Sequence, residues 1–189
     1  AAQAGARLCV LPELVLTGYT CGDLFLQDTL LSSARRALEA IVDATANLDM
    51  ISLIGLPLDV NGRVYNCAAA TYRGHVLAFI PKTNLPNYGE FYERRHFVPG
   101  PKDAFEITFA GQRTLFGTNL LFACREMPEF VLGVEICEDL WAPVPPSCSH
   151  ALAGATVVAN LSASDETVGK AAYRRELVAG QSARLLCGY

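Results

Sequence analysis

The sequence lacks the patterns that mark membrane-spanning, nucleic-acid-binding and nucleotide-binding proteins. None of its apolar stretches approaches the ~20 residues that cross a bilayer as a helix. It has no basic run, and its net charge of −4 makes nucleic acid an unexpected partner. It contains neither a P-loop nor a Ser-Gly-Gly-x-Asp-Ser run, so ATP and Mg²⁺ are not expected to bind to these residues.

The seven cysteines include no Cys-x-x-Cys pair, so no zinc site or other metal centre is predicted. An odd number of cysteines, several of them inside apolar stretches, does not fit a disulfide framework either. The pattern is typical of a protein kept reduced in the cytoplasm, which is the expected location. With 51% hydrophobic residues, a chain of 189 residues suffices for one domain with a sizeable core.

Hydrophobic periodicity predicts an α/β protein with mixed sheets. A helix is expected to begin at Asp28, and Asn61-Gly62 is a strong hairpin signal between two apolar strands. Residues 83–104 form a loop rich in Pro, Asn and Gly, and a loop of this length is usually functional. A second long helix is expected within residues 166–187, and the expected strands are residues 8–11, 51–58, 63–72, 75–80, 105–109, 120–123, 130–136 and 156–160.

Three expected strands end in residues of complementary chemistry, namely Glu13, Lys82 and Cys137. The chain has only three lysines against twelve arginines, so a lysine at a strand end is unusual. Taken singly, Glu13 and Lys82 are also consistent with solvated residues at strand tips, and Cys137 is also consistent with a buried structural cysteine. Strand ends on one edge of an α/β sheet converge where sites are built. Together the three residues predict a nucleophilic thiol assisted by a carboxylate and an ammonium group.

In their local contexts, Glu13, Lys82 and Cys137 resemble the Glu-Lys-Cys triad of the nitrilase superfamily of carbon–nitrogen hydrolases. Four ordered blocks also resemble the glutaminase domain of the glutamine-dependent NAD synthetases, and they are far more specific than any single motif. These blocks are Pro12-Glu13-Leu14 with Cys21-Gly22-Asp23, residues 82–97, residues 133–141, and residues 160–164 with Gly169-Lys170. The resemblance covers essentially the whole chain.

The resemblance implies the four-layer α-β-β-α sandwich of the nitrilase superfamily, incomplete at both ends. Residues 1–189 would then be one glutaminase domain, as a fragment of a longer polypeptide. The synthetase domain of the same polypeptide would be a partner, and ATP and Mg²⁺ would bind there rather than to this chain. A homo-oligomer is also implied, because domains of this type tend to pair through large interfaces.

The resemblance further implies a set of residues around the triad. Glu90 would support Lys82 within the long loop, with Glu93 as the rival candidate. Residues that would bind the glutamine substrate are Tyr19, Tyr88, Phe91, Glu138, Ser164 and Lys170. Lys170 stands where relatives carry arginine, and a lysine lacks the fork of donors that binds a carboxylate at two points.

The chemistry implied by the triad is hydrolysis of the side-chain amide of glutamine. The thiol of Cys137 attacks the amide carbon, Glu13 exchanges the proton, and Lys82 stabilises the oxyanion with the backbone N–H of Glu138. Ammonia leaves, and water releases glutamate from the thioester.

Two other functions stay open at this point. One is a free-standing nitrilase-type amidase that acts on another small amide, and the other is a catalytically inactive assembly fragment. A cysteine–histidine protease is disfavoured, because the three histidines form no evident set with Cys137. Of these, His96 lies in the long loop beside two arginines and is expected to be exposed to solvent.

Overall fold

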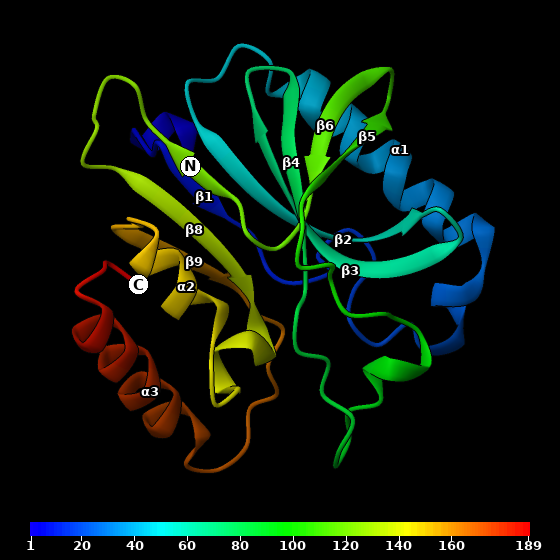
Figure 1. Cartoon of the computed structure of the whole chain (residues 1–189). Coiled ribbons are helices and arrows are strands. Elements are labelled where there is room, and N and C mark those ends of the chain that lie inside the picture. The colour runs from blue at the N-terminus through cyan, green and yellow to red at the C-terminus, as the bar shows by residue number, and fades with distance from the viewer.

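A computed structural model describes all residues from Ala1 to Tyr189 as two packed β-sheets with helices on their outer faces (Figure 1). Helix α1 (Asp28–Ala44) covers one sheet, and helices α2 (Pro146–Leu152) and α3 (Lys170–Leu185) cover the other. The order of layers is therefore α-β-β-α, as the sequence implied. None of the helices is both long and apolar enough to span a membrane.

The larger sheet has six strands in the order β1-β2-β3-β4-β6-β5. Its central part is an antiparallel meander, while β1 pairs with β2 and β4 pairs with β6 in parallel. The strands are β1 (Leu8–Val10), β2 (Ile51–Val60), β3 (Arg63–Tyr72), β4 (His75–Pro81), β5 (Phe105–Phe109) and β6 (Gln112–Phe116). The turn at Asn61-Gly62 has positive φ at both residues, which is the backbone that this dipeptide favours in a hairpin.

The smaller sheet has three strands in the order β7-β8-β9, namely β7 (Leu121–Ala123), β8 (Val131–Ile136) and β9 (Val157–Leu161). Strand β8 pairs antiparallel with β7 and parallel with β9. Four short 3₁₀ turns complete the chain: η1 (Ala2–Ala4), η2 (Gly22–Leu26), η3 (Glu93–Arg95) and η4 (Cys137–Trp141). Both sheets are thus mixed, as predicted.

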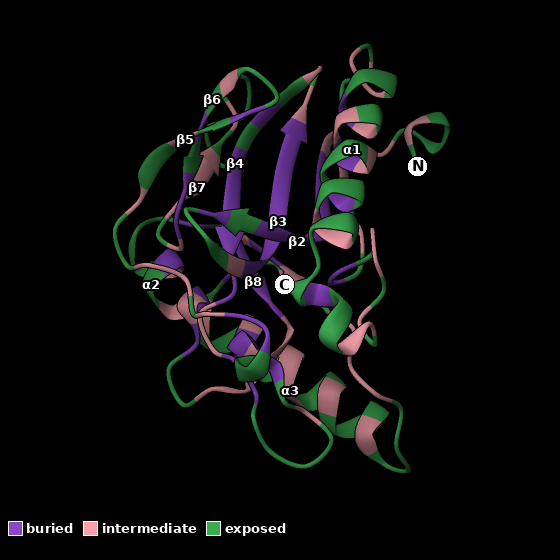
Figure 2. Cartoon of the chain, turned by 90° about the vertical axis from the view of Figure 1, so that its right-hand side faces the viewer, coloured by how far each residue is buried: buried purple, intermediate pink, exposed green.

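The core lies in two layers, one between the sheets and one under α1. Between the sheets, Ala78 and Ile80 of β4 pack with Val134 and Ile136 of β8. Under α1, Leu38 and other apolar residues on one helix face pack on β2, β3 and β4. Figure 2 shows that β2, β3 and β8 are buried over most of their length. The site residues Glu13, Lys82 and Cys137 follow β1, β4 and β8, so they are attached to a tightly packed scaffold.

One strand and one α-helix were not predicted from the sequence. Strand β6 was not predicted, although its alternating burial is that of a half-buried strand. Helix α2 was not predicted either, because its sequence is poor in strong helix formers. Buried polar contacts stabilise it instead: the N–H of Ser147 donates to Glu135 over 2.8 Å, and Gln181 donates to the Ser147 hydroxyl over 2.8 Å.

Candidate active site

Glu13 and Lys82 form a buried ion pair between two strand ends of the larger sheet. Lys82 Nζ donates to Glu13 Oε1 over 2.7 Å, and both side chains are almost fully buried. Asn66 Nδ2 donates to the same oxygen over 2.7 Å, and the N–H of Ala163 donates to Glu13 Oε2 over 3.2 Å. The carboxylate of Glu13 is therefore held by groups from both sheets.

The turn that carries Glu13 is pressed against Gly55 of β2. A side-chain carbon at Gly55 would lie 2.4 Å from the backbone nitrogen of Leu14 and 2.4 Å from the carbonyl oxygen of Pro12. Real side chains never approach backbone atoms so closely, so the turn needs a glycine here. Because Gly55 has no side chain, the turn after β1 can lie directly on β2, and Glu13 stays buried.

Glu93, not Glu90, is the second carboxylate on Lys82. Lys82 Nζ donates to Glu93 Oε1 over 2.6 Å, and the hydroxyl of Tyr19 donates to the same oxygen over 2.7 Å. The expectation for Glu90 is thus corrected. The 3₁₀ turn η3 begins at Glu93 and folds its side chain inward, whereas Glu90 is exposed on the pocket side of the loop.

Cys137 directly follows β8 and is the first residue of η4, with a positive φ of 43°. A non-glycine residue rarely adopts this left-handed backbone, and such strain clusters at functional sites. The N–H of Cys137 donates to Asn160 Oδ1 over 2.9 Å, and the hydroxyl of Ser162 donates to Cys137 Sγ over 3.3 Å. Residues of β9 and the segment after it therefore fix the sharp turn and face the thiol.

The electrostatics of the three groups are coupled. The pKa of the Cys137 thiol is raised to about 12, mainly by burial and then by the charge of Glu13, while the charge of Lys82 opposes both. For Lys82, burial alone would lower the pKa, but the carboxylates of Glu13 and Glu93 outweigh it and raise the pKa above its usual value. Burial also raises the pKa of Glu93, although Lys82 opposes this. The resting thiol is thus protonated at neutral pH, and it needs a base to react.

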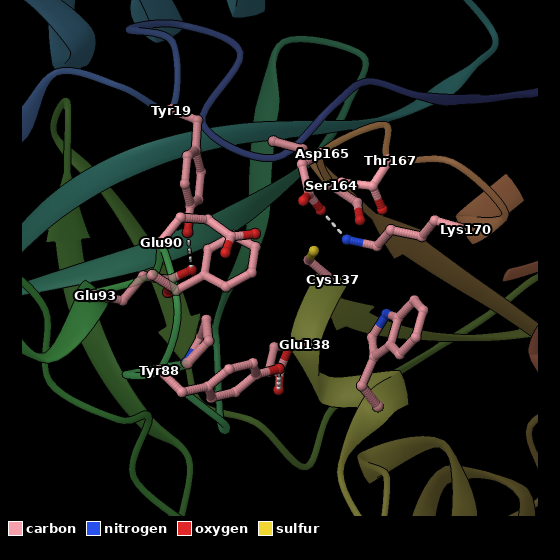
Figure 3. Close-up of a pocket in the computed structure, with 14 residues that line it drawn as sticks. Tyr19, Tyr88, Glu90, Glu93, Cys137, Glu138, Ser164, Asp165, Thr167 and Lys170 are labelled. Carbon is pink, nitrogen blue, oxygen red and sulfur yellow. Dashed lines mark hydrogen bonds and ion pairs between the residues drawn. The ribbon is translucent and has the colours of Figure 1, made fainter. Parts of the chain in front are cut away.

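A cavity of about 340 Å³ opens above Cys137 (Figure 3). All six residues expected to bind substrate line it, which are Tyr19, Tyr88, Phe91, Glu138, Ser164 and Lys170. Further lining residues were not predicted from the sequence, among them Trp141, Asp165 and Thr167. Trp141 is the only tryptophan of the chain and lies in the block around Cys137, so its position was the available signal.

The lining of the cavity carries charges of both signs. Glu138 accepts a hydrogen bond of 2.7 Å from the Tyr88 hydroxyl. Lys170 forms an ion pair with Asp165, and its ammonium lies 5.6 Å from the ring centre of Trp141 and 5.9 Å from that of Phe91. Figure 3 shows Glu138 and Lys170 on different sides of the Cys137 sulfur. Such a pocket can bind a small molecule that carries both a positive and a negative charge.

The histidines take no part in this arrangement, but His96 differs from expectation. It is buried rather than exposed, and its Nε2 lies 3.0 Å from Asp23 Oδ1 while its ring packs on Phe25. Arg95 binds the same carboxylate of Asp23, so this contact fastens η3 to η2. No group of three or more His, Cys, Asp or Glu side chains is arranged to hold a metal ion.

A family model described as carbon–nitrogen hydrolase matches residues 1–185 of this sequence. The chain belongs to the carbon–nitrogen hydrolase family. Its sandwich of two mixed sheets and its site of Glu13, Lys82 and Cys137 fit this assignment.

Curated relatives of this carbon–nitrogen hydrolase are named glutamine-dependent NAD(+) synthetase. The protein from Mycobacterium tuberculosis is 49% identical over 185 residues, which are 98% of this chain and 27% of that protein. The protein from Thermotoga maritima is 38% identical over 177 residues, which are 93% of this chain and 27% of that protein. The chain thus spans about a quarter of the length of these relatives.

Solved structures agree with the fold. A glutamine-dependent NAD(+) synthetase from Cytophaga hutchinsonii matches with a TM-score of 0.85 and 34% identity, over 98% of this chain and 29% of that one. An amidase from Nesterenkonia sp. matches with a TM-score of 0.70 and 21% identity, over 99% of this chain and 62% of that one. The second likeness concerns the fold alone.

Proposed function

We propose that this chain is the glutamine-hydrolysing part of a glutamine-dependent NAD synthetase. The observation that carries the proposal is the cavity at Cys137, whose lining includes both Glu138 and Lys170. Glutamine is a zwitterion with a side-chain amide, so its head group can meet both charges while its amide reaches the thiol. The relatives named glutamine-dependent NAD(+) synthetase support the choice of glutamine over other amides.

The first half of the reaction forms a thioester. Glu13 takes the proton from the Cys137 thiol as the sulfur attacks the amide carbon, and the carbonyl oxygen becomes an oxyanion. Lys82 and the backbone N–H of Glu138 stabilise that oxyanion, and one such donor typically contributes ~3 kcal/mol. Glu13 then gives its proton to the leaving nitrogen, the C–N bond breaks, and ammonia departs.

The second half releases glutamate. Glu13, again ionised, takes a proton from a water molecule as its oxygen attacks the thioester carbon. The C–S bond breaks, the thiolate recovers the proton from Glu13, and glutamate leaves. The pKa of the thiol, raised to about 12 by burial, makes the proton transfer to Glu13 a required part of the first half rather than a prior equilibrium.

Glu138 and Lys170 in the cavity would recognise the amino-acid head group of glutamine. Glu138 pairs with the substrate ammonium, and Lys170 exchanges part of its contact with Asp165 for the substrate carboxylate. A separate synthetase domain of the same polypeptide would use the ammonia to amidate nicotinic acid adenine dinucleotide. ATP and Mg²⁺ would bind to that domain, and this chain would need no cofactor.

The test is the Cys137→Ala variant of the full-length protein. We expect it to lose NAD synthesis driven by glutamine and to keep synthesis driven by free ammonia, because the thiol makes ammonia and another site consumes it. Cys148→Ala, which removes a thiol on α2, is the matched control and should keep both activities. Loss of both activities in a folded Cys137→Ala protein would contradict the two-site proposal.

A substrate panel separates the proposal from a free-standing amidase. Glutamine and a series of short amides and nitriles are compared by kcat/KM. The proposal requires glutamine to be the best substrate by a wide margin. A preference for a short amide that lacks an amino-acid head group would assign an amidase instead.

A further inference from the structure

Asp139 is a buried carboxylate two residues after the nucleophile. It is only 1% exposed. It does not line the cavity and forms no ion pair, so neither substrate binding nor a buried salt bridge explains it. A carboxylate deep in a core is retained only where its acceptors are needed.

The oxygens of Asp139 accept hydrogen bonds from two different strand ends. On the β8 side, the N–H of Ile136 donates to Oδ2 over 3.0 Å. On the β4 side, the backbone N–H of Asn84 donates to Oδ1 over 2.7 Å, and its side-chain Nδ2 donates over 3.0 Å. The N–H of Thr83 lies 3.2 Å from Oδ1 and 3.4 Å from Oδ2.

These donors flank the reacting groups in the chain. Ile136 directly precedes Cys137, and Thr83 directly follows Lys82. Strands β4 and β8 belong to different sheets, and the contacts between them are apolar. Apolar packing is non-directional, whereas hydrogen bonds to one carboxylate fix both backbones relative to the same atoms.

We propose that Asp139 is a positioning residue that sets the distance between the Cys137 thiol and the Lys82 ammonium during thioester formation. The proposal rests on the function proposed above. Only an ionised carboxylate can do this, because it accepts on both oxygens. An amide or a protonated acid presents a donor on one side, and that donor would face an N–H of β8 or of the segment after β4.

The surroundings make the charge of Asp139 sensitive to pH near neutrality. The pKa of Asp139 is raised to about 7, mainly by burial and also by the charge of Glu135, while the N–H groups of Ile136 and Asn84 and the charge of Lys82 oppose the rise. Helix α2 and strand β9 also pack against η4. The titratable residues of these two elements are Cys148 and His150, both in α2. Because the active form is ionised, thioester formation should fall as the pH drops through the pKa of Asp139.

The experiment measures single-turnover thioester formation in the full-length protein with glutamine. For Asp139→Asn we expect a rate on the order of 10²-fold lower, as small misplacements of reacting groups cause, with little change in the glutamine concentration at half-saturation. The acid limb of the rate against pH that belongs to Asp139 should disappear. A merely structural role would lower the melting temperature but would leave the shape of the pH profile unchanged.

Glu135→Gln is the matched control, since it removes another buried carboxylate beside the same turn. Its negative charge raises the pKa of Asp139, so its removal should move the acid limb to lower pH without abolishing it. An acid limb that stays in place in Glu135→Gln and in Asp139→Asn would belong to another group and would overturn the proposal.

Asn84→Ala decides the matter if Asp139→Asn does not fold. It removes the Nδ2 contact of 3.0 Å and keeps the carboxylate, so a rate about tenfold lower with unchanged half-saturation supports the proposal. A folded Asp139→Asn or Asn84→Ala protein that forms the thioester at the wild-type rate overturns it. If the wild-type protein forms no thioester with glutamine, the proposed function fails, and that result is distinct from a failure of the variants.

Discussion

Lys82 Nζ lies 2.6 Å from Glu93 Oε1 and 2.7 Å from Glu13 Oε1, so one buried ammonium pairs with two carboxylates from different segments of the chain. Such a cluster carries one net negative charge when all three groups are ionised. The raised pKa of Glu93, caused by burial and by the charge of Glu13, relieves part of this imbalance. The two buried carboxylates raise the pKa of Lys82, so its ammonium stays charged although it is shielded from water.

Glu93→Gln should reduce turnover more than Glu90→Gln. Glu93 contacts Lys82 directly and also receives the Tyr19 hydroxyl, whereas Glu90 lies at the cavity wall. We expect kcat to fall by about 10-fold or more in Glu93→Gln, by analogy with misplaced catalytic groups. In Glu90→Gln the change should be smaller and fall mainly on KM. Steady-state kinetics with glutamine measure both, and equal losses in kcat would contradict the assignment of Glu93.

Glu13→Gln and Lys82→Met should shift the acidity of Cys137 in opposite directions. The charge of Glu13 raises the pKa of the thiol and the charge of Lys82 lowers it. The pKa of the Cys137 thiol should therefore be lower in Glu13→Gln and higher in Lys82→Met than in the wild-type protein, although both variants hydrolyse glutamine more slowly. The ultraviolet absorbance of the thiolate, followed against pH, measures this pKa without requiring Glu13 to act as a base. A thiol pKa that moves in the same direction in both variants would refute the coupling.

The losses caused by Glu13→Gln and Lys82→Met should not multiply. Loss of the base is expected to reduce thioester formation by about 10²–10⁴-fold, and loss of the oxyanion donor by about 10²-fold. Both groups act on one transition state, so the double variant should be far less impaired than the product of the single losses. Rapid-quench measurement of thioester formation tests this. Strictly multiplicative losses would mean that the two groups act independently.

Gly55→Ala should lower both stability and activity. The added carbon would lie 2.4 Å from backbone atoms of the turn that carries Glu13, and overpacking of this kind costs about 1–3 kcal/mol or more in the free energy of unfolding. Gly180→Ala is the matched control, because its added carbon meets nothing within 4 Å in α3. That variant should be more stable by roughly 0.5–1 kcal/mol, since alanine favours a helix. Thermal unfolding and glutaminase assays of both variants give the comparison.

Much of the fold was predictable because its elements have strong local signals. The helix that begins at Asp28, the hairpin at Asn61-Gly62 and the strands that lead to Lys82 and Cys137 are confirmed within a few residues. Each depends on hydrophobic periodicity or on a turn dipeptide, which are properties of neighbouring residues. The four layers followed from the resemblance rather than from these patterns.

The remaining features depend on contacts that no local pattern encodes. Glu90 and Glu93 lie in the same loop, and only the inward turn of η3 decides which of them reaches Lys82. Helix α2 depends on Glu135 and Gln181, which are distant in sequence from its own residues. His96 is buried with its Nε2 within hydrogen-bonding distance of Asp23, which lies 73 residues away in the sequence. In each case a tertiary contact overrides the local preference of the chain.

The left-handed backbone of Cys137 places selection for heat resistance in conflict with selection for catalysis. Glycine adopts a φ of 43° without the steric penalty of a side chain, so Cys137→Gly should raise the melting temperature while it removes the nucleophile. A screen that rewards survival on heating alone would therefore enrich inactive variants at this position. Engineering of a sturdier enzyme should hold residue 137 fixed and seek its gains at sites such as Gly180, where no strain serves the chemistry.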